Sequence, residues 1–474
     1  MKAKTFQINW HDNLAVFSVD FDPSRPGRFA TAGGDSNVRL WRLMESSNGN
    51  VSVNFVAELA RHSAAVNVVR FSPADSLLAS SGDDGTIIVW KQSQAASGSL
   101  ENASVAGAEE TWKAVSLLRG SLADIYDISW SADGRFIISG SVDNTARIWD
   151  VKQAKCIHCI ADHSNYIQGV AWDPKGHFFA TQSSDRAVNI YEWTVKTLNT
   201  TKKSLLVKHS RLEDKSTGDG PSKPHSLSGQ TGGPQYVRLY HSETLTSFFR
   251  RLCFTPDGSV LLTPAGIHRV HDSSTTKSGS SADEQTQNAV YIYARDRLAE
   301  APVAMLSGFQ KPAIAIRCAP HRFCKRPPAS SGKPSSEWLG LPYRLVFAVA
   351  TQDAVILYDS QQHEPLAYLA NFHYATLTDL SWSPNGRHLL MTSSDGYCSV
   401  VIFDEGELGE IYGQPISTSV TTQVEPVKPA APSTPKPVSG MVKVEATPSE
   451  IANPVTTTKT GKKRIQPTLI SSIN

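Results

Sequence analysis

The sequence lacks two features that would assign it to a membrane or to bulk binding of nucleic acid. No stretch reaches the roughly 18 consecutive apolar residues of a membrane-spanning helix. The first residues, MKAKTFQINWHDN, contain no apolar core of a signal peptide. Basic and acidic residues nearly balance, and the formal net charge is only +2, which argues against binding nucleic acid through bulk positive charge. We therefore expect no membrane partner and no strong direct nucleic-acid site.

Cysteine is also scarce. The six cysteines are scattered, and without an export signal they predict reduced thiols in the cytosol or nucleus. Cys156 and Cys159 have CxxC spacing, but they fall where a strand is expected, and residues three apart on a strand point to opposite faces. No second cysteine pair lies near them in sequence. We expect ordinary strand cysteines at this position and no metal site.

The common catalytic motifs are absent as well. The sequence contains no GxSxG, P-loop, HExxH or Rossmann fingerprint. We expect a protein that is not an enzyme and that carries no cofactor.

What the sequence does contain is a short unit of β-strands, most regular at Ile125–Val151. Three runs of four to six mostly apolar residues are separated by turns at SADG and at Asp143-Asn144, where Asp, Asn and Gly adopt positive φ most easily. The third run ends in Trp149-Asp150. Short strands split by such turns predict a β-meander, and the Trp-Asp ending is typical of one blade of a β-propeller.

The unit recurs along the chain. In four strong copies an Asp stands six residues before the aromatic residue that ends the third strand, and three weaker copies follow. Seven copies predict an all-β fold, a closed seven-bladed propeller over residues 1–412. The strong copies span His11–Leu43, His62–Lys91, Ile125–Val151 and His163–Trp193, and the weaker copies span Phe248–Tyr293, Pro312–Tyr358 and His373–Asp404.

The two ends of this region predict how the ring closes. The seventh copy has no convincing outer strand, whereas Lys4–Ile8 is a strand-like run that precedes the first copy. We predict that Lys4–Ile8 supplies the outer strand of the last blade, which would remove the exposed edges.

The copies resemble the WD-repeat family. That resemblance implies that a His, a turn Asp, a Ser or Thr and the Trp of each blade form a buried hydrogen-bonded set. The third copy has Arg119-Gly120-Ser121 in place of the His. Because the set recurs blade after blade, we interpret it as structural and not catalytic. Its predicted members are His11, Asp35, Trp41, His62, Asp84, Trp90, Asp143, Trp149, His163 and Asp185.

Four segments exceed the length that blades need, and their composition predicts disorder: 93–110, 212–234, 272–288 and 323–341. We expect the first two between the third and fourth strands of a blade and the last between the first and second strands, all on one face. The segment 272–288 is expected on the opposite face. Such loops serve either as binding elements or as neutral decoration, and both alternatives stay open.

Two short runs combine basic and aromatic residues, at His321–Arg326 and Phe249–Arg251. They are isolated, so we expect solvated faces and not phosphate sites.

The C-terminal part changes character. Residues 413–460 are rich in Pro, Thr and Ser, which predicts a disordered tail. Residues 461–474 place a basic cluster directly before an apolar one, which predicts a short peptide that binds by strand addition or groove docking. A nuclear localisation signal or a frayed end is the alternative. The residues of this predicted motif are Lys462, Lys463, Arg464, Ile465, Pro467 and Leu469, with Ile470 as a further apolar anchor.

The run INWHDNLAVFSVDF, the seven copies and the ending KKRIQPTLI together resemble the WD-repeat (middle) subunit of the chromatin assembly factor complex, a replication-coupled histone chaperone, in a fungal-type form. The resemblance implies a nuclear subunit that works with a large acidic subunit and a second WD-repeat subunit. Together they would deposit histones three and four on replicated or repaired DNA.

The resemblance also implies that the terminal peptide binds the anti-silencing-function histone chaperone. Lys463 and Arg464 match the basic pair of the family motif, Ile465 the buried aliphatic residue and Pro467 the proline. Thr468 intervenes before Leu469, where the family motif often places an aliphatic residue sooner.

Two alternatives remain. The related replication-independent histone regulator has a similar propeller, but its chains are typically longer and hold the basic-aliphatic motif internally, whereas in this sequence the motif stands at the end. A generic WD-repeat scaffold, such as a substrate receptor of a ubiquitin ligase, predicts a tail without function.

Overall fold

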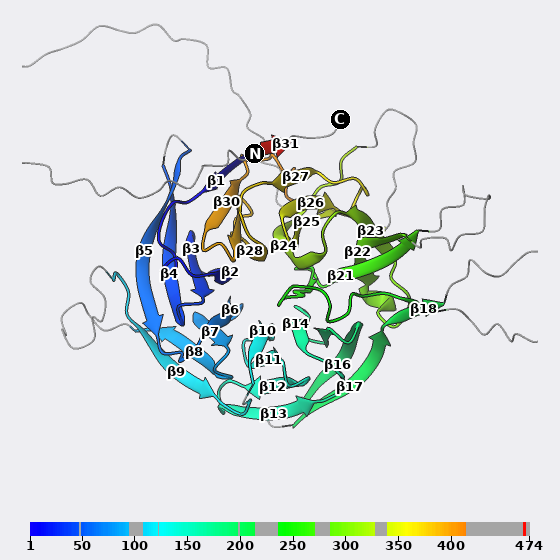
Figure 1. Ribbon diagram of the computed structural model, residues 1–474, viewed down its shortest axis with the longest axis horizontal. Coiled ribbons are helices and arrows are strands. Elements are labelled where there is room, and N and C mark those ends of the chain that lie inside the picture. Colours follow the sequence, from blue (N-terminus) through cyan, green and yellow to red (C-terminus); the bar gives the residue numbers. More distant parts are fainter. Residues whose placement is uncertain are drawn as a thin grey trace, which may run out of the picture. The chain divides into compact units, whose positions relative to one another are not determined.

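The computed structural model describes residues 1–46, 49–93, 108–121, 123–197, 200–213, 236–270, 285–327, 339–413 and 468–470. Seven of the antiparallel sheets that these residues form are arranged as blades around a central axis, and their only helical element is the short 3-10 helix η2 (Arg295–Arg297) (Figure 1). The predicted all-β, seven-bladed propeller is confirmed. No helix in this part of the chain has the length and hydropathy needed to cross a membrane.

Each blade has at least four antiparallel strands, and in blades 1 to 6 the first four follow one another in the sequence from the innermost outward. Blade 1 is β2 (Val16–Phe21), β3 (Arg28–Gly33), β4 (Asn37–Glu45) and β5 (Val51–Ala60), and blade 2 is β6 (Val66–Phe71), β7 (Leu77–Gly82), β8 (Ile87–Gln92) and β9 (Trp112–Leu118). Blade 3 is β10 (Ile125–Trp130), β11 (Phe136–Ser141), β12 (Ala146–Asp150) and β13 (Lys155–Ile160). Blade 4 is β14 (Ile167–Trp172), β15 (Phe178–Ser183), β16 (Ala187–Thr197) and β17 (Thr200–His209).

The remaining blades follow the same plan. Blade 5 is β20 (Cys253–Phe254), β21 (Val260–Val270), β22 (Gln285–Ala294) and β23 (Ala304–Phe309). Blade 6 is β24 (Ala313–Phe323), β25 (Arg344–Thr351), β26 (Ala354–Asp359) and β27 (Ala367–Ala370), with β31 (Thr468–Ile470) as a fifth strand. Blade 7 is β28 (Leu377–Trp382), β29 (His388–Ser393), β30 (Cys398–Ile402) and, as its outermost strand, β1 (Lys2–Thr5).

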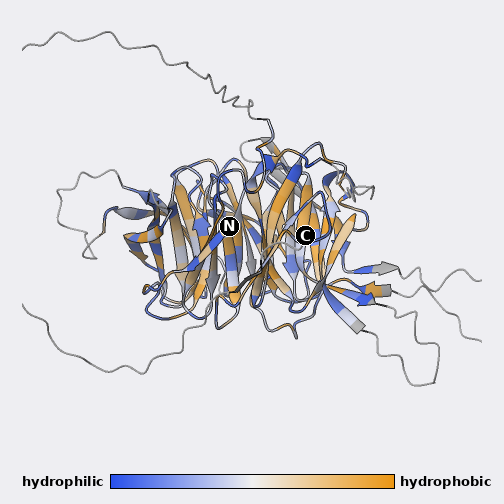
Figure 2. Ribbon diagram, turned by 90° about the horizontal axis from the view of Figure 1, so that it is seen from above, coloured by the Kyte–Doolittle hydropathy of each residue, from blue (hydrophilic) through white to orange (hydrophobic). Residues whose placement is uncertain are grey.

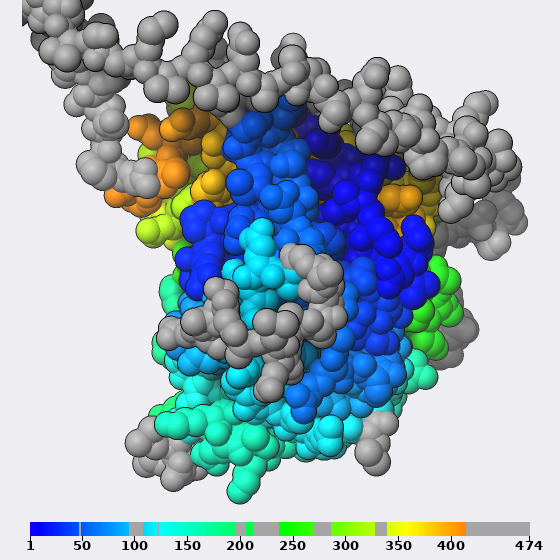
Figure 3. All heavy atoms as spheres, turned by 90° about the vertical axis from the view of Figure 1, so that its left-hand side faces the viewer, coloured from blue at the N-terminus to red at the C-terminus, as the bar shows by residue number. Residues whose placement is uncertain are grey.

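The N-terminal strand closes the ring, as predicted. β1 pairs antiparallel with β30, from Lys2 opposite Ile402 to Thr5 opposite Ser399. In Figure 3 the dark blue first residues lie against orange residues of blade 7. The strand ends earlier than the predicted range 4–8, because the chain then turns inward. Phe6 and Trp10 are buried in the core of the first blade, where the rings of Trp10 and Trp41 lie 4.8 Å apart.

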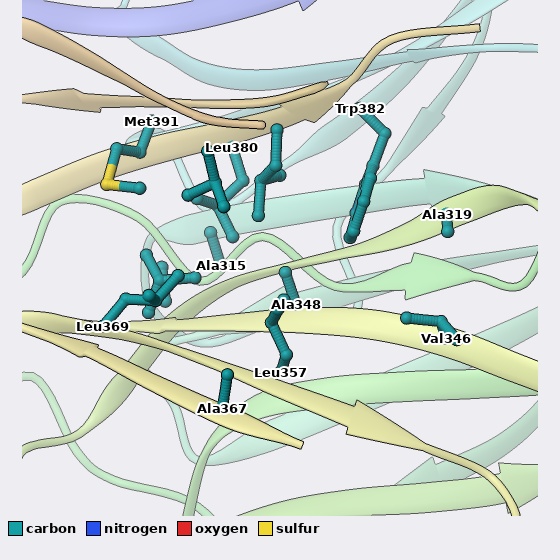
Figure 4. Close-up of a cluster of buried hydrophobic side chains, with 14 of the residues drawn as sticks. Ala315, Ala319, Val346, Ala348, Leu357, Ala367, Leu369, Leu380, Trp382 and Met391 are labelled. Atoms are coloured by element: carbon teal, nitrogen blue, oxygen red, sulfur yellow. The ribbon is translucent and has the colours of Figure 1, made fainter. Parts of the chain in front are cut away.

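The core lies between the blades. All six residues of β28 and all six of β29 are buried, which requires a covering layer on both faces of the sheet. Leu380, Trp382 and Met391 of blade 7 pack with Leu357 and Leu369 of blade 6 (Figure 4). In Figure 2 the apolar residues are concentrated in the strands, and the connections at both edges are mostly hydrophilic.

The long insertions fall between strands largely as predicted, with one error in placement, and the segment 272–288 ends earlier than predicted because Gln285–Asn288 belong to β22. Residues 94–107 connect β8 to β9 and residues 328–338 connect β24 to β25; both lie outside the described residues, as do 271–284 between β21 and β22. The prediction that 212–234 joins the third and fourth strands of a blade is wrong. Residues Thr200–His209 already form the fourth strand of blade 4, so that segment connects blades 4 and 5. It is flanked by β18 (Arg211–Glu213) and β19 (Tyr236–Arg238), which pair with each other.

Deleting Met1–Phe6 should destabilise the propeller far beyond the size of the segment. The deletion leaves the edge of β30 unpaired and removes the buried Phe6. We expect the free energy of unfolding in urea to fall by about 3 kcal/mol or more. Deleting an equal number of residues within 94–107 is the control and should leave the unfolding midpoint unchanged. Equal midpoints for the two deletions would contradict a closing role for β1.

Candidate interaction sites

The predicted polar residues of blade 1 come together in one buried chain of hydrogen bonds. His11 Nδ1 donates to Asp35 Oδ1 (2.6 Å), the Thr31 hydroxyl bonds to His11 Nε2 (2.8 Å), and Trp41 Nε1 donates to Thr31 Oγ1 (2.8 Å). His11 precedes the innermost strand, Asp35 lies in the β3–β4 turn and Trp41 lies in β4. The chain of bonds therefore links the segment before β2 to β3, to the β3–β4 turn and to β4.

Blades 2 and 4 repeat this arrangement. His62 Nδ1 lies 2.8 Å from Asp84 Oδ2, and Trp90 Nε1 donates to Ser80 Oγ, which also contacts His62 Nε2. In blade 4, His163 Nδ1 lies 3.0 Å from Asp185 Oδ2 and its Nε2 lies 2.7 Å from Thr181 Oγ1. The Trp position of blade 4 is occupied by Tyr191.

Blade 3 has no histidine at the corresponding position. Trp149 is fully buried, donates from Nε1 to Ser139 Oγ (2.9 Å), and lies so close to Gly120 that a Cβ there would stand 3.2 Å from its ring. Asp143 is bound by Arg147 at 2.7 Å in place of an imidazole.

Blade 7 contains a set that the sequence analysis missed. His373 Nδ1 lies 3.1 Å from Asp395 Oδ2, and its Nε2 lies 2.9 Å from Ser399 Oγ. Ser399 also contacts Thr5 Oγ1 (2.8 Å), so this set reaches the closing strand. A signal was present, because Ser393-Ser394-Asp395 repeats the Ser183-Ser184-Asp185 of blade 4.

The electrostatics of these sets fit a structural role. Burial lowers the pKa of His11, which favours the neutral imidazole that accepts a hydrogen bond at Nε2. Burial alone would raise the pKa of Asp185, but the hydrogen bond and charge of His163 lower it to about 2. The side chains of His11 and Asp35 are 0% and 5% exposed. We interpret the sets as architecture, since they leave no room for a substrate.

The centre of the propeller holds a second polar network, which the sequence analysis did not identify. Arg251 Nη1 lies 2.5 Å from Asp379 Oδ2, Arg70 Nη1 lies 2.8 Å from the same oxygen, and Arg317 Nη2 lies 3.1 Å from Asp379 Oδ1. We call this group the hub. Its charged members come from the innermost strands or their leading residues in six blades: Asp20, Arg70, Asp127, Arg251, Arg317 and Asp379.

Arg251 connects opposite sides of the ring. Its guanidinium also donates to the carbonyls of Asn67 (2.7 Å) and Phe17 (3.1 Å) in blades 2 and 1. The expectation that Phe249–Arg251 forms a solvated face is wrong: Arg250 and Arg251 are both 0% exposed. Both guanidiniums donate to backbone carbonyls, Arg250 to those of His241 and Ser242 and Arg251 to those of Asn67 and Phe17.

The hub carboxylates respond differently to the same surroundings. Burial alone would raise the pKa of Asp379, but Arg251, Arg70 and Arg317 hold it well below its usual range. Burial raises the pKa of Asp20 to about 6, and Arg70 and the Phe71 amide only partly oppose that effect. Asp20 is therefore a hub group whose charge changes close to neutral pH.

A cavity of about 430 Å³ opens where the innermost strands of blades 2 to 5 end. Arg70 and Arg317 line it together with aromatic and proline side chains. Those apolar residues include Phe71, Pro73, Trp130, Trp172, Pro174 and Phe254.

The C-terminal peptide is described only at β31. Its backbone pairs antiparallel with β27, with Leu469 opposite Leu369 and Ile470 opposite Tyr368 (Figure 1). The remaining predicted motif residues, Lys462, Lys463, Arg464, Ile465 and Pro467, lie outside the described residues.

The cysteine pair is not arranged as predicted. Both cysteines lie in the outer strand β13, but a bulge there pairs Cys156 with Trp149 and Cys159 with Arg147. Since Trp149 and Arg147 are two apart in β12, both cysteines point to the same face, and the prediction of opposite faces is wrong. In the part of the chain that the structure describes, no group of three or more His, Cys, Asp or Glu is placed to hold a metal ion.

The second basic run lies partly at the surface. Arg322 packs its guanidinium 5.2 Å from the ring of Tyr343, and the 44% exposed Arg326 lies 3.4 Å from Asp359.

Comparisons with known proteins agree with this architecture. A family model described as the CAF1B/HIR1 beta-propeller domain matches residues 1–408, and one described as the HIRA B motif matches residues 455–474. A chromatin assembly factor 1 subunit of Mus musculus is 41% identical over 420 residues, covering 86% of this chain and 68% of that protein. Its Schizosaccharomyces pombe namesake is 36% identical and covers 99% of both chains. Protein HIR1 of Gibberella zeae is 27% identical, over 84% of this chain but 34% of its own length.

Arg251→Met should destabilise the fold strongly, because it removes one of three cations from the buried Asp379 and two hydrogen bonds to backbone carbonyls. We expect the free energy of unfolding to fall by about 3–5 kcal/mol in urea titrations. Arg297→Met is the control, since Arg297 is 55% exposed, and it should change stability by less than about 0.5 kcal/mol. A similar small effect of both substitutions would rule out a central role for Arg251.

Asp20→Asn should change how stability depends on pH. The folded pKa of about 6 lies above the ordinary value, so the folded state holds a proton that the unfolded chain releases between about pH 4 and 6. This contribution stabilises the fold at low pH and is lost as the pH rises through about 6. Between pH 5 and 7 we expect the free energy of unfolding of the wild type to fall by about 1–2 kcal/mol relative to that of the variant. The value is small because Asp20 stays partly exposed. If urea titrations gave the same pH dependence of the unfolding free energy for wild type and Asp20→Asn, the assignment would be contradicted. Asp296→Asn is the control and should show the same pH dependence as wild type.

Proposed function

This chain belongs to the CAF1B/HIR1 beta-propeller family, and from that premise we propose that it is a non-enzymatic scaffold subunit of a histone chaperone complex. The proposed complex deposits newly made histone three–histone four dimers on DNA during replication and repair, in the nucleus. The observation that carries the proposal is the match over 99% of both chains to a protein named as a subunit of chromatin assembly factor 1. The resemblance noted in the sequence is confirmed at the level of the family.

We further propose that the partners are a large acidic subunit and a second WD-repeat subunit, together with histones three and four, bound directly or through the other subunits. A rigid ring with seven blades supports this role, since it presents many separate edges and loops to several partners at once.

The C-terminal peptide is proposed to link the complex to the anti-silencing-function histone chaperone. The HIRA B motif match over residues 455–474 supports this role. Burial of Ile465 and Leu469 would each contribute roughly 1.5–3 kcal/mol. Arg464 would add a charge-assisted hydrogen bond to a carboxylate. Because residues 413–460 join the peptide to the propeller, its effective concentration stays high near histones held by the complex.

The pairing of β31 with β27 supports the proposed binding mode. The segment Thr468–Ile470 already adds as a strand to an exposed sheet edge in its own chain. Strand addition of this kind gains affinity from main-chain hydrogen bonds and specificity from alternate side chains.

The replication-independent regulator is the nearest alternative. Protein HIR1 of Gibberella zeae is 27% identical to this chain, whereas the chromatin assembly factor 1 relative from Schizosaccharomyces pombe is 36% identical. The higher identity favours the replication-coupled subunit.

Arg464→Ala combined with Ile465→Ala should abolish binding to the anti-silencing-function chaperone while the propeller stays folded. The two substitutions remove one charge-assisted bond and one buried aliphatic side chain, so we expect affinity to fall at least about a hundredfold in a pull-down or titration.

Lys443→Ala combined with Val444→Ala is the matched control, because it removes a basic and an aliphatic neighbour elsewhere in the tail. This control should bind normally. Undiminished binding by the Arg464/Ile465 double variant would refute the motif assignment and favour a generic scaffold.

A further inference from the structure

Exposed apolar side chains gather on the face of the ring where the innermost strands begin. Among the described residues nine large apolar side chains are exposed, and four of them lie in the connections that lead into an innermost strand. Phe248 is 63% exposed and Tyr166 is 47% exposed. All innermost strands run in the same direction, so their beginnings share one face. Exposed apolar groups concentrated at one place on a protein surface mark an interaction surface. The four are Leu14, Tyr166, Phe248 and Tyr374.

Aromatic rings on this face form a continuous row over the hub. The ring centroids of Tyr126 and Phe248 lie 6.2 Å apart, those of Phe248 and Phe249 6.4 Å, and those of Phe249 and Phe17 6.2 Å. The Arg251 guanidinium lies 4.0 Å from the Phe249 ring centroid. The row joins blades 1, 3 and 5, with Tyr126 and Phe17 at its two ends and Phe249 over the arginine.

Two carboxylates stand beside this row. Asn67 Nδ2 donates both to Asp83 Oδ1 (2.7 Å) and to the Ile125 carbonyl (3.1 Å), which places Asp83 next to Asp124 and Tyr126. Burial and then the charge of Asp83 raise the pKa of Asp124. Within the described residues neither carboxylate makes an ion pair. Like charges left together without a counter-ion are unfavourable, and a bound cation would relieve them.

A third, independent group adds to this picture. Gln168 Nε2 donates to the carbonyls of Ser247 (2.9 Å) and Phe248 (3.4 Å) and so holds the Phe248 segment in place. Its Oε1 is buried and accepts no hydrogen bond from the residues that the structure describes. An unpaired buried acceptor is costly, and this carbonyl oxygen adds partial negative charge beside the Phe248 segment, which favours a cation over an anion there.

We propose that this surface, the channel mouth formed by Asp83, Asp124, Tyr126, Tyr166 and Phe248, binds an arginine side chain in a basic, extended segment of a partner protein. A guanidinium stacks on aromatic faces and donates to two carboxylates at once. An acidic segment would be repelled by Asp83 and Asp124, and a purely apolar segment would leave both carboxylates unpaired. The site is separate from the C-terminal peptide, so neither proposal depends on the other.

The test uses the full chain and two labelled peptides of equal length, one alternating arginine with serine and one alternating glutamine with serine. Fluorescence anisotropy should show binding of the arginine peptide and at least about tenfold weaker binding of the glutamine peptide. Asp83→Asn combined with Asp124→Asn should lower the affinity for the arginine peptide at least about tenfold. Phe248→Ala should lower that affinity about threefold to tenfold.

Asp296→Asn and Tyr412→Ala are matched controls, because they remove an exposed carboxylate and an exposed ring elsewhere. Both should bind the arginine peptide within about twofold of wild type. Melting temperatures of all variants are measured alongside; the 63% exposure of Phe248 predicts an intact fold for Phe248→Ala. Equal binding of both peptides, unchanged binding by either channel-mouth variant, or equal loss in Asp296→Asn would each overturn the proposal.

Discussion

The ion pair between Arg251 and Asp379 is the interaction on which the arrangement of the blades depends. Apolar burial between blades is non-directional, and it would tolerate small rotations of one blade against the next. The hub does not, because one buried carboxylate must meet three guanidiniums from blades 2, 5 and 6 at 2.5–3.1 Å. Arg251 further binds carbonyls of blades 1 and 2 across the ring. The apolar core therefore holds the blades together without fixing their orientation, and the ion pairs of the hub fix the spacing of the innermost strands.

The hub and the closing strand solve two different problems of a ring. The hub sets the inner radius, where polar groups would otherwise be buried without partners. The pairing of β1 with β30 closes the outer edge of the last blade, which would otherwise expose a row of unpaired backbone groups. The two meet in blade 7, which supplies Asp379 to the hub and Ser399, bound to both His373 and Thr5, to the closure. Because the hub charges pair with one another, the surfaces that remain accessible are the two faces of the ring and the outer edges of the blades.

The sequence predicted the repeated parts of this structure well and the convergent parts poorly. Strand patterns and turns are local features of the sequence, and counting their repeats gives the seven blades. The spacing of six residues from Asp35 to Trp41 recurs in the other strong copies. The hub has no such local pattern, since Arg70 or Asp379 alone in a strand looks like a solvent-facing residue. Only ring closure brings those positions together. Cys156 and Cys159 lie in a strand as predicted, but their faces were predicted wrongly because a single bulge reverses the alternation of the strand. The channel mouth was missed for the same reason as the hub: Asp83, Tyr126 and Phe248 belong to three different blades.

The closing strand also decides when the ring can become complete during synthesis. β1 leaves the ribosome first, and its partner β30 follows about 400 residues later, an interval of roughly 20–80 s at ordinary rates of translation. Throughout that time the nascent chain is an open arc whose last finished blade shows a free edge. Phe6 and Trp10 can pack into blade 1 early, which keeps the first strand positioned near the site of the eventual joint. Because unpaired edges invite pairing with other chains, the unclosed arc is more prone to association than the finished ring.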